Sequence, residues 1–345
     1  MPRVAVFVSQ IIVYMLLAST TLQAGDPAHH KHKKCTTLKI EDQYQSTEGL
    51  QQGLAGAGIV ESNLIYAIDF TNSNRKRGKL TYVVSSMTEE DKKIFMNLHW
   101  TDPRWPNPYR QAINITSNVL KYFDKDQKYP VYGFGDSKTK GHSVFPVTLG
   151  DEYCIGVEQI EQAYAKVLPN IEMAGPTSFA PAINKAMDIV YANNGAYHIL
   201  VIITDGSLTE GFETLNLNTL AKASLFPLSI IIVGVGDGET NGGFDGMNLL
   251  DDGVENRLFD NVQFVKLSKI MADNPTDALA LQLKFAVAAL MEVPTQYDIM
   301  KTMGMFRAGY VDKVLARVIK KDVSKESDLK KINKKIRTLK HKPFN

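Results

Sequence analysis

The sequence predicts an α/β fold, a doubly wound and mostly parallel β-sheet flanked by helices. Three runs, residues 64–70, 198–204 and 228–235, are continuously apolar instead of alternating between apolar and polar side chains. Continuous apolar runs of this length are typical of strands that are buried on both faces. Segments with helical spacing of apolar residues separate these runs. Strands that alternate with helices form βαβ units with right-handed crossovers, which favours a parallel sheet.

Further elements follow from the same patterns. Short apolar runs predict strands at 131–134 and 261–267, and apolar side chains spaced by three and four predict helices at 109–122, 157–168, 179–191 and 278–291. The segment 87–106 is polar, contains both tryptophans and fits no element. We interpret it as an insertion between the first strand and its helix.

The N-terminal residues resemble a secretory signal. Arg3 precedes an apolar run at 4–18, and small and polar residues follow up to residue 24. We therefore predict a signal peptide at 1–24 and a secreted protein, with an uncleaved signal anchor as the alternative. Residues 25–45 are polar and basic and predict a solvated linker. The globular domain is predicted at 46–295, followed by a basic helical tail at 296–345.

Charge is unevenly distributed along the chain. Residues 313–345 contain twelve Lys or Arg and three Asp or Glu, a net of +9, so the remaining residues carry −7 of the total of +2. A basic tail of this kind favours contact with an anionic membrane or another polyanion, and a solvated helical extension is the alternative. No sequence-specific nucleic-acid binding is predicted.

Oxygen-bearing side chains gather where the predicted strands end. Asp69, Thr71 and Ser73 follow the first strand, Asp205 ends the strand at 198–204, and Thr177 opens a helix between them. In doubly wound sheets, ligands bind at the carboxyl ends of the strands. Any one of these residues could serve only as a helix cap, but their combination predicts a site for one hard cation such as Mg²⁺. Asp237 follows another strand end and either flanks this site or forms a turn.

The donor set predicts recognition and not hydrolysis. Two carboxylates leave a divalent cation short of negative charge, so the cation would accept a carboxylate from outside the chain. The motifs of a catalytic site are missing, since there is no G-x-S-x-G elbow and no H-E-x-x-H. His99, His142 and His198 share no obvious acidic partner in the sequence. We therefore predict that the chain is not an enzyme and that its partner is a protein with an accessible Asp or Glu.

The motifs at these residues support a resemblance to a known family. The D-x-T-x-S, G-P-T and T-D-G segments, in this order, resemble the metal-ion-dependent adhesion site of von Willebrand factor A domains. The sequence around these motifs is closer still to the A domain of copines, and it also resembles the related domain of plant RING-type ubiquitin ligases. The segments that carry the likeness are 68–71, 107–113, 132–135, 175–181 and 227–236, within a match over about residues 35–295. The resemblance implies a von Willebrand A fold and one Mg²⁺ or Mn²⁺ at Asp69, Thr71, Ser73, Thr177 and Asp205.

The sequence also departs from these relatives. Copines carry two C2 domains before the A domain, for which this chain has no room. The plant ligases end in a RING finger, whereas the two cysteines here, Cys35 and Cys154, cannot build one. Two functions therefore remain open. The first is a metal-dependent adhesion or scaffold module in the secretory pathway. The alternative is an intracellular, RING-less relative of the copine-like ligases that acts as a scaffold for substrates or partners in the cytoplasm.

Overall fold

The computed structural model describes residues 46–322, except residue 60 and the short stretches 122–123, 149, 207, 240–241, 255–256 and 274–276. The predicted signal peptide, the linker and residues 323–345 of the basic tail lie outside the described residues. These features stay predictions.

A six-stranded sheet forms the centre of the molecule, in the order β4-β3-β1-β6-β7-β8. Five strands are parallel, and β4 joins the edge in the antiparallel direction. A separate antiparallel pair is formed by β2 and β5. The predicted fold class, a doubly wound and mostly parallel sheet flanked by helices, is confirmed. The strands are β1 (Asn63–Asp69), β2 (Lys128–Tyr129), β3 (Val131–Phe134), β4 (Phe145–Pro146), β5 (Cys154–Ile155), β6 (His198–Thr204), β7 (Leu228–Gly234) and β8 (Val262–Lys266).

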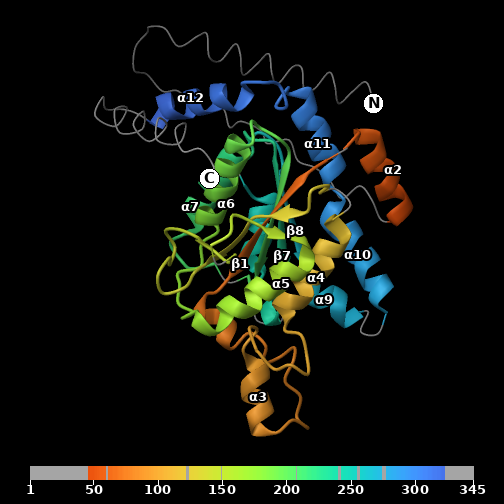
Figure 1. Cartoon of the computed structure of the whole chain (residues 1–345), viewed down its shortest axis with the longest axis vertical. Helices are drawn as coiled ribbons and strands as arrows, with labels where there is room; N and C mark the ends of the chain where they lie inside the picture. The colour runs from red at the N-terminus through yellow and green to blue at the C-terminus, as the bar shows by residue number, and fades with distance from the viewer. Residues whose placement is uncertain are drawn as a thin grey trace.

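Helices cover both faces of the sheet (Figure 1). One face is packed by α2, α4, α5, α10 and α11, and the other by α6, α7, α8 and α12. The helices are α2 (Thr47–Ala57), α3 (Glu89–Met96), α4 (Pro108–Leu120), α5 (Gly156–Val167), α6 (Ala180–Ala192), α7 (Glu213–Ala223), α8 (Asp245–Asp252), α9 (Leu267–Asp273), α10 (Ala278–Leu290), α11 (Val293–Thr302) and α12 (Tyr310–Asp322), with single 3-10 turns η1 (Asn72–Arg75), η2 (Leu168–Asn170) and η3 (Asp237–Glu239).

The continuous apolar strands are explained by this layering. Successive side chains of a strand point to opposite faces, so Tyr66 and Ile68 of β1 pack in one core cluster and Ile65 and Ala67 in the other. A polar residue at any of these positions would be buried without water. The single polar atom of the Tyr66 side chain, its hydroxyl oxygen, lies 2.9 Å from Ser117 Oγ and is satisfied there.

The connections place a topological switch point between β1 and β6. From β1 the chain crosses to β3 on one side, and it later returns to β6 on the other side of β1. Ligands of doubly wound proteins bind in the crevice at the carboxyl ends of the two strands that flank such a point. In this chain those ends are Asp69 and Thr204, and Asp205 follows directly.

Two predictions about organisation need correction. The segment 87–106 is not without structure, because it contains α3, whose first turn is capped by Thr88 and carries three acidic residues. The segment projects beyond the strand ends in Figure 1. The packed domain also continues past residue 295, since Ile299, Met300 and Met305 are buried in the same core cluster as the sheet. The stretch Ala278–Thr302 is long and apolar enough by composition for a membrane span, and it folds here as α10 and α11, with Phe285 in the core.

Candidate metal centre

The loop after β1 is fixed by the carboxylate of Asp69, which is fully buried. Its Oδ1 accepts a hydrogen bond from the backbone N–H of Thr71 at 2.8 Å, and its Oδ2 accepts one from the hydroxyl of Thr204 at 2.6 Å. Thr204 Oγ1 accepts in turn from the N–H of Gly206 at 3.1 Å. The hydroxyl oxygens of Thr71 and Ser73 lie 3.1 Å apart. Three predicted donors, Asp69, Thr71 and Ser73, are therefore gathered in one turn.

The imidazole of His99 stabilises this turn through a hydrogen bond to its backbone. Its Nε2 lies 2.8 Å from the backbone carbonyl oxygen of Asp69, so Nε2 carries the proton and donates it. Its Nδ1 then accepts from the hydroxyl of Tyr164 at 2.7 Å. The ring stacks between Phe70 and Tyr109, with centroid distances of 4.9 and 4.0 Å. Burial lowers the pKa of His99 to about 3, so the ring is neutral at physiological pH.

Asn74 ties the same turn to α4. Its amide nitrogen donates to the backbone carbonyl of Thr71 at 3.1 Å, and its Oδ1 accepts from the hydroxyl of Tyr109 at 2.7 Å. His99, Asn74 and Tyr109 are site residues that the sequence reasoning missed. The partners of His99 are a backbone carbonyl and a tyrosine hydroxyl, and neither leaves a motif in the sequence.

A second loop brings Thr177 to the same edge of the sheet. Ala174 forms an isolated parallel bridge with Thr71, and its N–H donates to the carbonyl of Gly135 at 3.1 Å. The backbone N–H of Thr177 donates to Thr209 Oγ1 at 2.8 Å, and its carbonyl accepts from the N–H of Thr209 at 3.2 Å. Thr177 is thus held between the loop that follows β1 and the loop that follows β6.

Gly135 makes this close approach of the two loops feasible. It has a φ of 82°, and a Cβ at this position would lie 2.2 Å from Cγ2 of Thr71. A side chain would therefore meet both backbone strain and a collision with a predicted metal donor.

The two acidic residues of the site interact electrostatically. Burial, and then the charge of Asp205, raise the pKa of Asp69 well above its usual range. Both carboxyl groups are fully buried, and both also raise the pKa of Tyr109. Two buried carboxylates that interact are unfavourable in their charged forms unless a proton or a cation offsets their repulsion.

The donor set fits a small hard cation. Two carboxylates and three hydroxyls from three loops are the oxygen ligands that Mg²⁺ and Mn²⁺ take, with water in the remaining positions. Among the residues that the structure describes, no group of three or more His, Cys, Asp or Glu converges as in a zinc or calcium centre. Metal binding would therefore depend on the hydroxyls of Thr71, Ser73 and Thr177.

Asp237, which we predicted to flank the site or to form a turn, holds another loop. Its two carboxylate oxygens accept from the backbone N–H groups of Leu80 and Thr81 at 2.9 and 2.8 Å, and from the hydroxyl of Thr81 at 2.7 Å. These bonds anchor the start of the segment that carries α3. Asp237 thus stabilises the surroundings of the site.

Together, the sheet order, the switch point and the three loops define an α/β domain of the von Willebrand A class. The chain matches the Copine family model over residues 97–308. It is 41% identical over 285 residues to the E3 ubiquitin-protein ligase RGLG2 of Arabidopsis thaliana, covering 79% of this chain and 57% of that protein. It is 39% identical over 269 residues to Copine family protein 2 of Caenorhabditis elegans, covering 76% of this chain and 3% of that protein. The chain belongs to the copine family.

Solved structures give a weaker likeness. A von Willebrand factor type A protein from Catenulispora acidiphila superposes with a TM-score of 0.37 at 13% identity, covering 67% of this chain and 43% of that one. Proximal thread matrix protein 1 from the mussel byssus, with a zinc-occupied MIDAS motif, gives a TM-score of 0.35 at 17% identity and covers 66% of this chain and 46% of that one. Since the chain spans just over half the length of RGLG2, the activity of the whole ligase is not carried over.

Proposed function

We propose that this chain is a recognition domain that captures an acidic group of a partner protein through one Mg²⁺ or Mn²⁺. Asp69, Thr71, Ser73, Thr177 and Asp205 would hold the ion. A cation bound there would offer an open position to a carboxylate oxygen of the partner. The protein residues would supply the binding surface and the fixed geometry, without a chemical step.

One observation carries the proposal, the burial of both Asp69 and Asp205 at the ends of the neighbouring strands β1 and β6. A structural role alone would be met by one carboxylate that accepts the hydrogen bonds of Thr71 and Thr204. The second buried acid raises the electrostatic free energy of the apo domain, as the raised pKa of Asp69 indicates. A divalent cation would remove that penalty, so part of its binding free energy would appear as stability of the domain.

We further propose that the domain acts inside the cell, as a scaffold for partners or substrates. This is the alternative of the two functions that the sequence leaves open. It is favoured because the relatives are named as ubiquitin ligases and copines. Mass spectrometry of the protein from its native tissue distinguishes the two locations. An intact Met1 supports the scaffold, and cleavage near residue 24 supports secretion.

Metal titration tests the site itself. Calorimetry with Mn²⁺ on the wild-type chain should give one binding site, and Asp69→Asn should weaken binding at least about tenfold, because the substitution removes one of two charges at the ion. Asp237→Asn is the matched control, since it alters another buried carboxylate at a strand end, one that holds the backbone of Leu80 and Thr81. Equal Mn²⁺ affinity in Asp69→Asn and wild type would overturn the assignment.

A further inference from the structure

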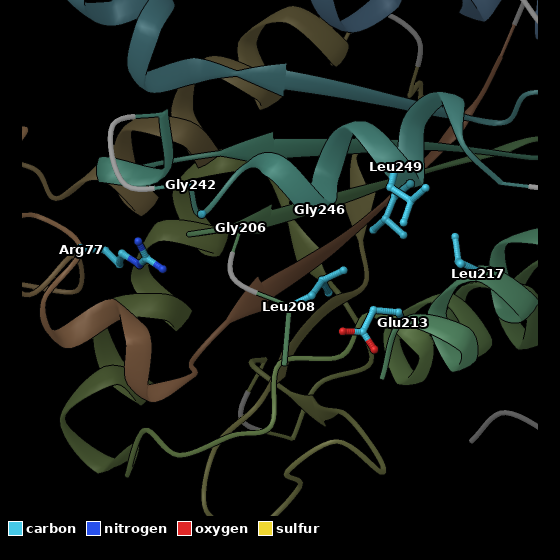
Figure 2. A pocket seen from close by; sticks show the side chains of 10 residues that line it. Arg77, Gly206, Leu208, Glu213, Leu217, Gly242, Gly246 and Leu249 are labelled. Carbon is cyan, nitrogen blue, oxygen red and sulfur yellow. The ribbon is translucent and has the colours of Figure 1, made fainter. Parts of the chain in front are cut away.

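A cavity of about 320 Å³ borders the loop that follows β6, and its lining begins at the residue after the candidate metal donor Asp205. Gly206, which follows the metal donor Asp205, forms part of its wall (Figure 2). The rest of the lining comes from Arg77, from the loop after β6, from α7, from Gly242 and Gly243 and from α8, including Leu208, Leu217 and Leu249. A ligand held at the metal would therefore reach this cavity with a neighbouring side chain.

Half of the cavity wall is apolar, and Arg77 and Glu213 add charged groups to it. Leu208, Leu217 and Leu249 extend into it from three separate segments in Figure 2. The side chain of Leu249 is 45% exposed, which is unfavourable for a large aliphatic group that has nothing packed on it. Glycines at 206, 242, 243 and 246 keep the space open, because side chains there would narrow it.

The rim on the metal side is basic. Arg77 lines the cavity, and its guanidinium points toward Gly206 in Figure 2. Arg75, Lys76 and Lys79 are exposed on the same turn, directly after the metal donor Ser73. A cation at the metal centre and the basic residues that follow Ser73 in the sequence favour an acidic partner, while Glu213 places one carboxylate in the cavity wall. A partner that is acidic throughout would not fill the leucine-lined space.

We infer that the cavity is a specificity pocket for the partner bound at the metal. The ligand is an acidic peptide segment whose metal-binding Asp or Glu is adjacent to an apolar side chain of about the size of leucine. The carboxylate binds at the metal centre, and the apolar side chain packs among Leu208, Leu217 and Leu249. This inference rests on the proposed function and adds the sequence character of the ligand.

Gly246, in the first turn of α8, allows a clean test. A Cβ at Gly246 would meet only Leu208 Cδ1, at 3.8 Å, which is ordinary van der Waals contact. Gly246→Leu therefore adds an apolar side chain at the cavity wall whose Cβ meets no backbone atom, and it leaves every candidate donor unchanged. Asn248→Leu is the matched control, because it places the same side chain on an exposed position of the same helix. Leu249→Ser is a second variant, which removes an apolar side chain from the cavity wall at a position that is already exposed.

The probes are three fluorescein-labelled nine-residue peptides, measured by fluorescence anisotropy in Mg²⁺ and in EDTA. The first has a central Glu flanked by two Leu in a Gly/Ser background, the second replaces both Leu by Ser, and the third replaces Glu by Gln. Wild type and Asn248→Leu should bind the first peptide about tenfold more tightly than the second, only in Mg²⁺. Gly246→Leu and Leu249→Ser should reduce this ratio to near one while Mn²⁺ affinity stays unchanged.

The outcomes separate the two proposals. Mg²⁺-dependent binding of the Glu peptides without any preference for Leu overturns the pocket and leaves the proposed function standing. The same holds if the preference for Leu persists in Gly246→Leu. Equal binding of the Leu peptide in EDTA shows that pocket and metal are not one site, which also overturns the inference. If no peptide binds in a manner that depends on Mg²⁺ and on Glu, the proposed function fails and the pocket fails with it.

Discussion

The stability of the domain should fall in acid because of His198, which lies at the start of β6 and far along the strand from the metal centre. Its ring is buried, with Nδ1–H donating to the carbonyl of Ala196 at 2.7 Å and Nε2 accepting from the amide of Asn193 at 2.9 Å. Both nitrogens are thus satisfied in the neutral form. Burial lowers the pKa of His198 from 6.5 to about 4.

The sign and the size of the effect follow from linkage. The unfolded chain takes up a proton on this residue near pH 6.5, and the folded chain does so only near pH 4. The stabilisation from His198 is therefore fully present above pH 6.5, decreases as the pH falls toward 4, and is constant below that. A pKa difference of this size corresponds to about 3 kcal/mol, at 1.36 kcal/mol for each pKa unit.

Urea unfolding of wild type and His198→Gln, at pH values from 7.5 to 4, measures this contribution. Every other titrating group is shared by both proteins, so it cancels in the difference between their free energies of unfolding. The advantage of wild type over the variant should shrink by about 3 kcal/mol across that range. A difference between wild type and His198→Gln that stays constant with pH would refute the reasoning.

Three further perturbations test other parts of the structure. Gly135→Ala should lower the free energy of unfolding by about 2–5 kcal/mol, from left-handed backbone strain and the collision with Thr71, and should weaken Mn²⁺ binding. Gly150 also has a positive φ, but an added Cβ there would meet nothing within 4 Å, so Gly150→Ala should show the cost of backbone strain alone. His99→Phe keeps the ring stack but removes both hydrogen bonds, so urea unfolding should show a loss of about 2–4 kcal/mol, and a loss under about 0.5 kcal/mol would contradict the role of His99. Truncation after residue 322 removes eight Lys or Arg and two acidic residues, and should abolish salt-sensitive retention on heparin; unchanged elution would remove the tail as a polyanion contact.

The strands and the candidate metal donors could be predicted from the sequence for the same reason. A strand buried on both faces must be apolar along its whole length, so β1, β6 and β7 stand out, and the polar residue that ends each run marks the carboxyl edge of the sheet. Asp69 and Asp205 are recognisable in this way from the sequence alone. The segment with α3 was not, because its helix depends on capping by Thr88 and has few apolar residues.

The supporting groups depend on tertiary contacts. His99 donates to the backbone carbonyl of Asp69, which is 30 residues away in the sequence. Because this bond is made to the main chain, the side-chain type at position 69 does not predict it. The leucine-lined cavity is likewise assembled from three separate segments, each of which has an ordinary composition. Local patterns identify which residues can act, whereas the surrounding packing decides how firmly they are held.

The antiparallel strand β4 limits how this molecule can associate. It has only two residues and ends in Pro146, which has no N–H to offer to a further strand. The ring of Phe145 lies over Gly133, so the neighbouring strand is covered as well. Exposed sheet edges invite other chains to extend the sheet, and short strands with proline prevent it. On this side the domain is therefore protected from edge-to-edge aggregation. Copies of the domain held close together in an assembly would not form a continuous sheet through β4.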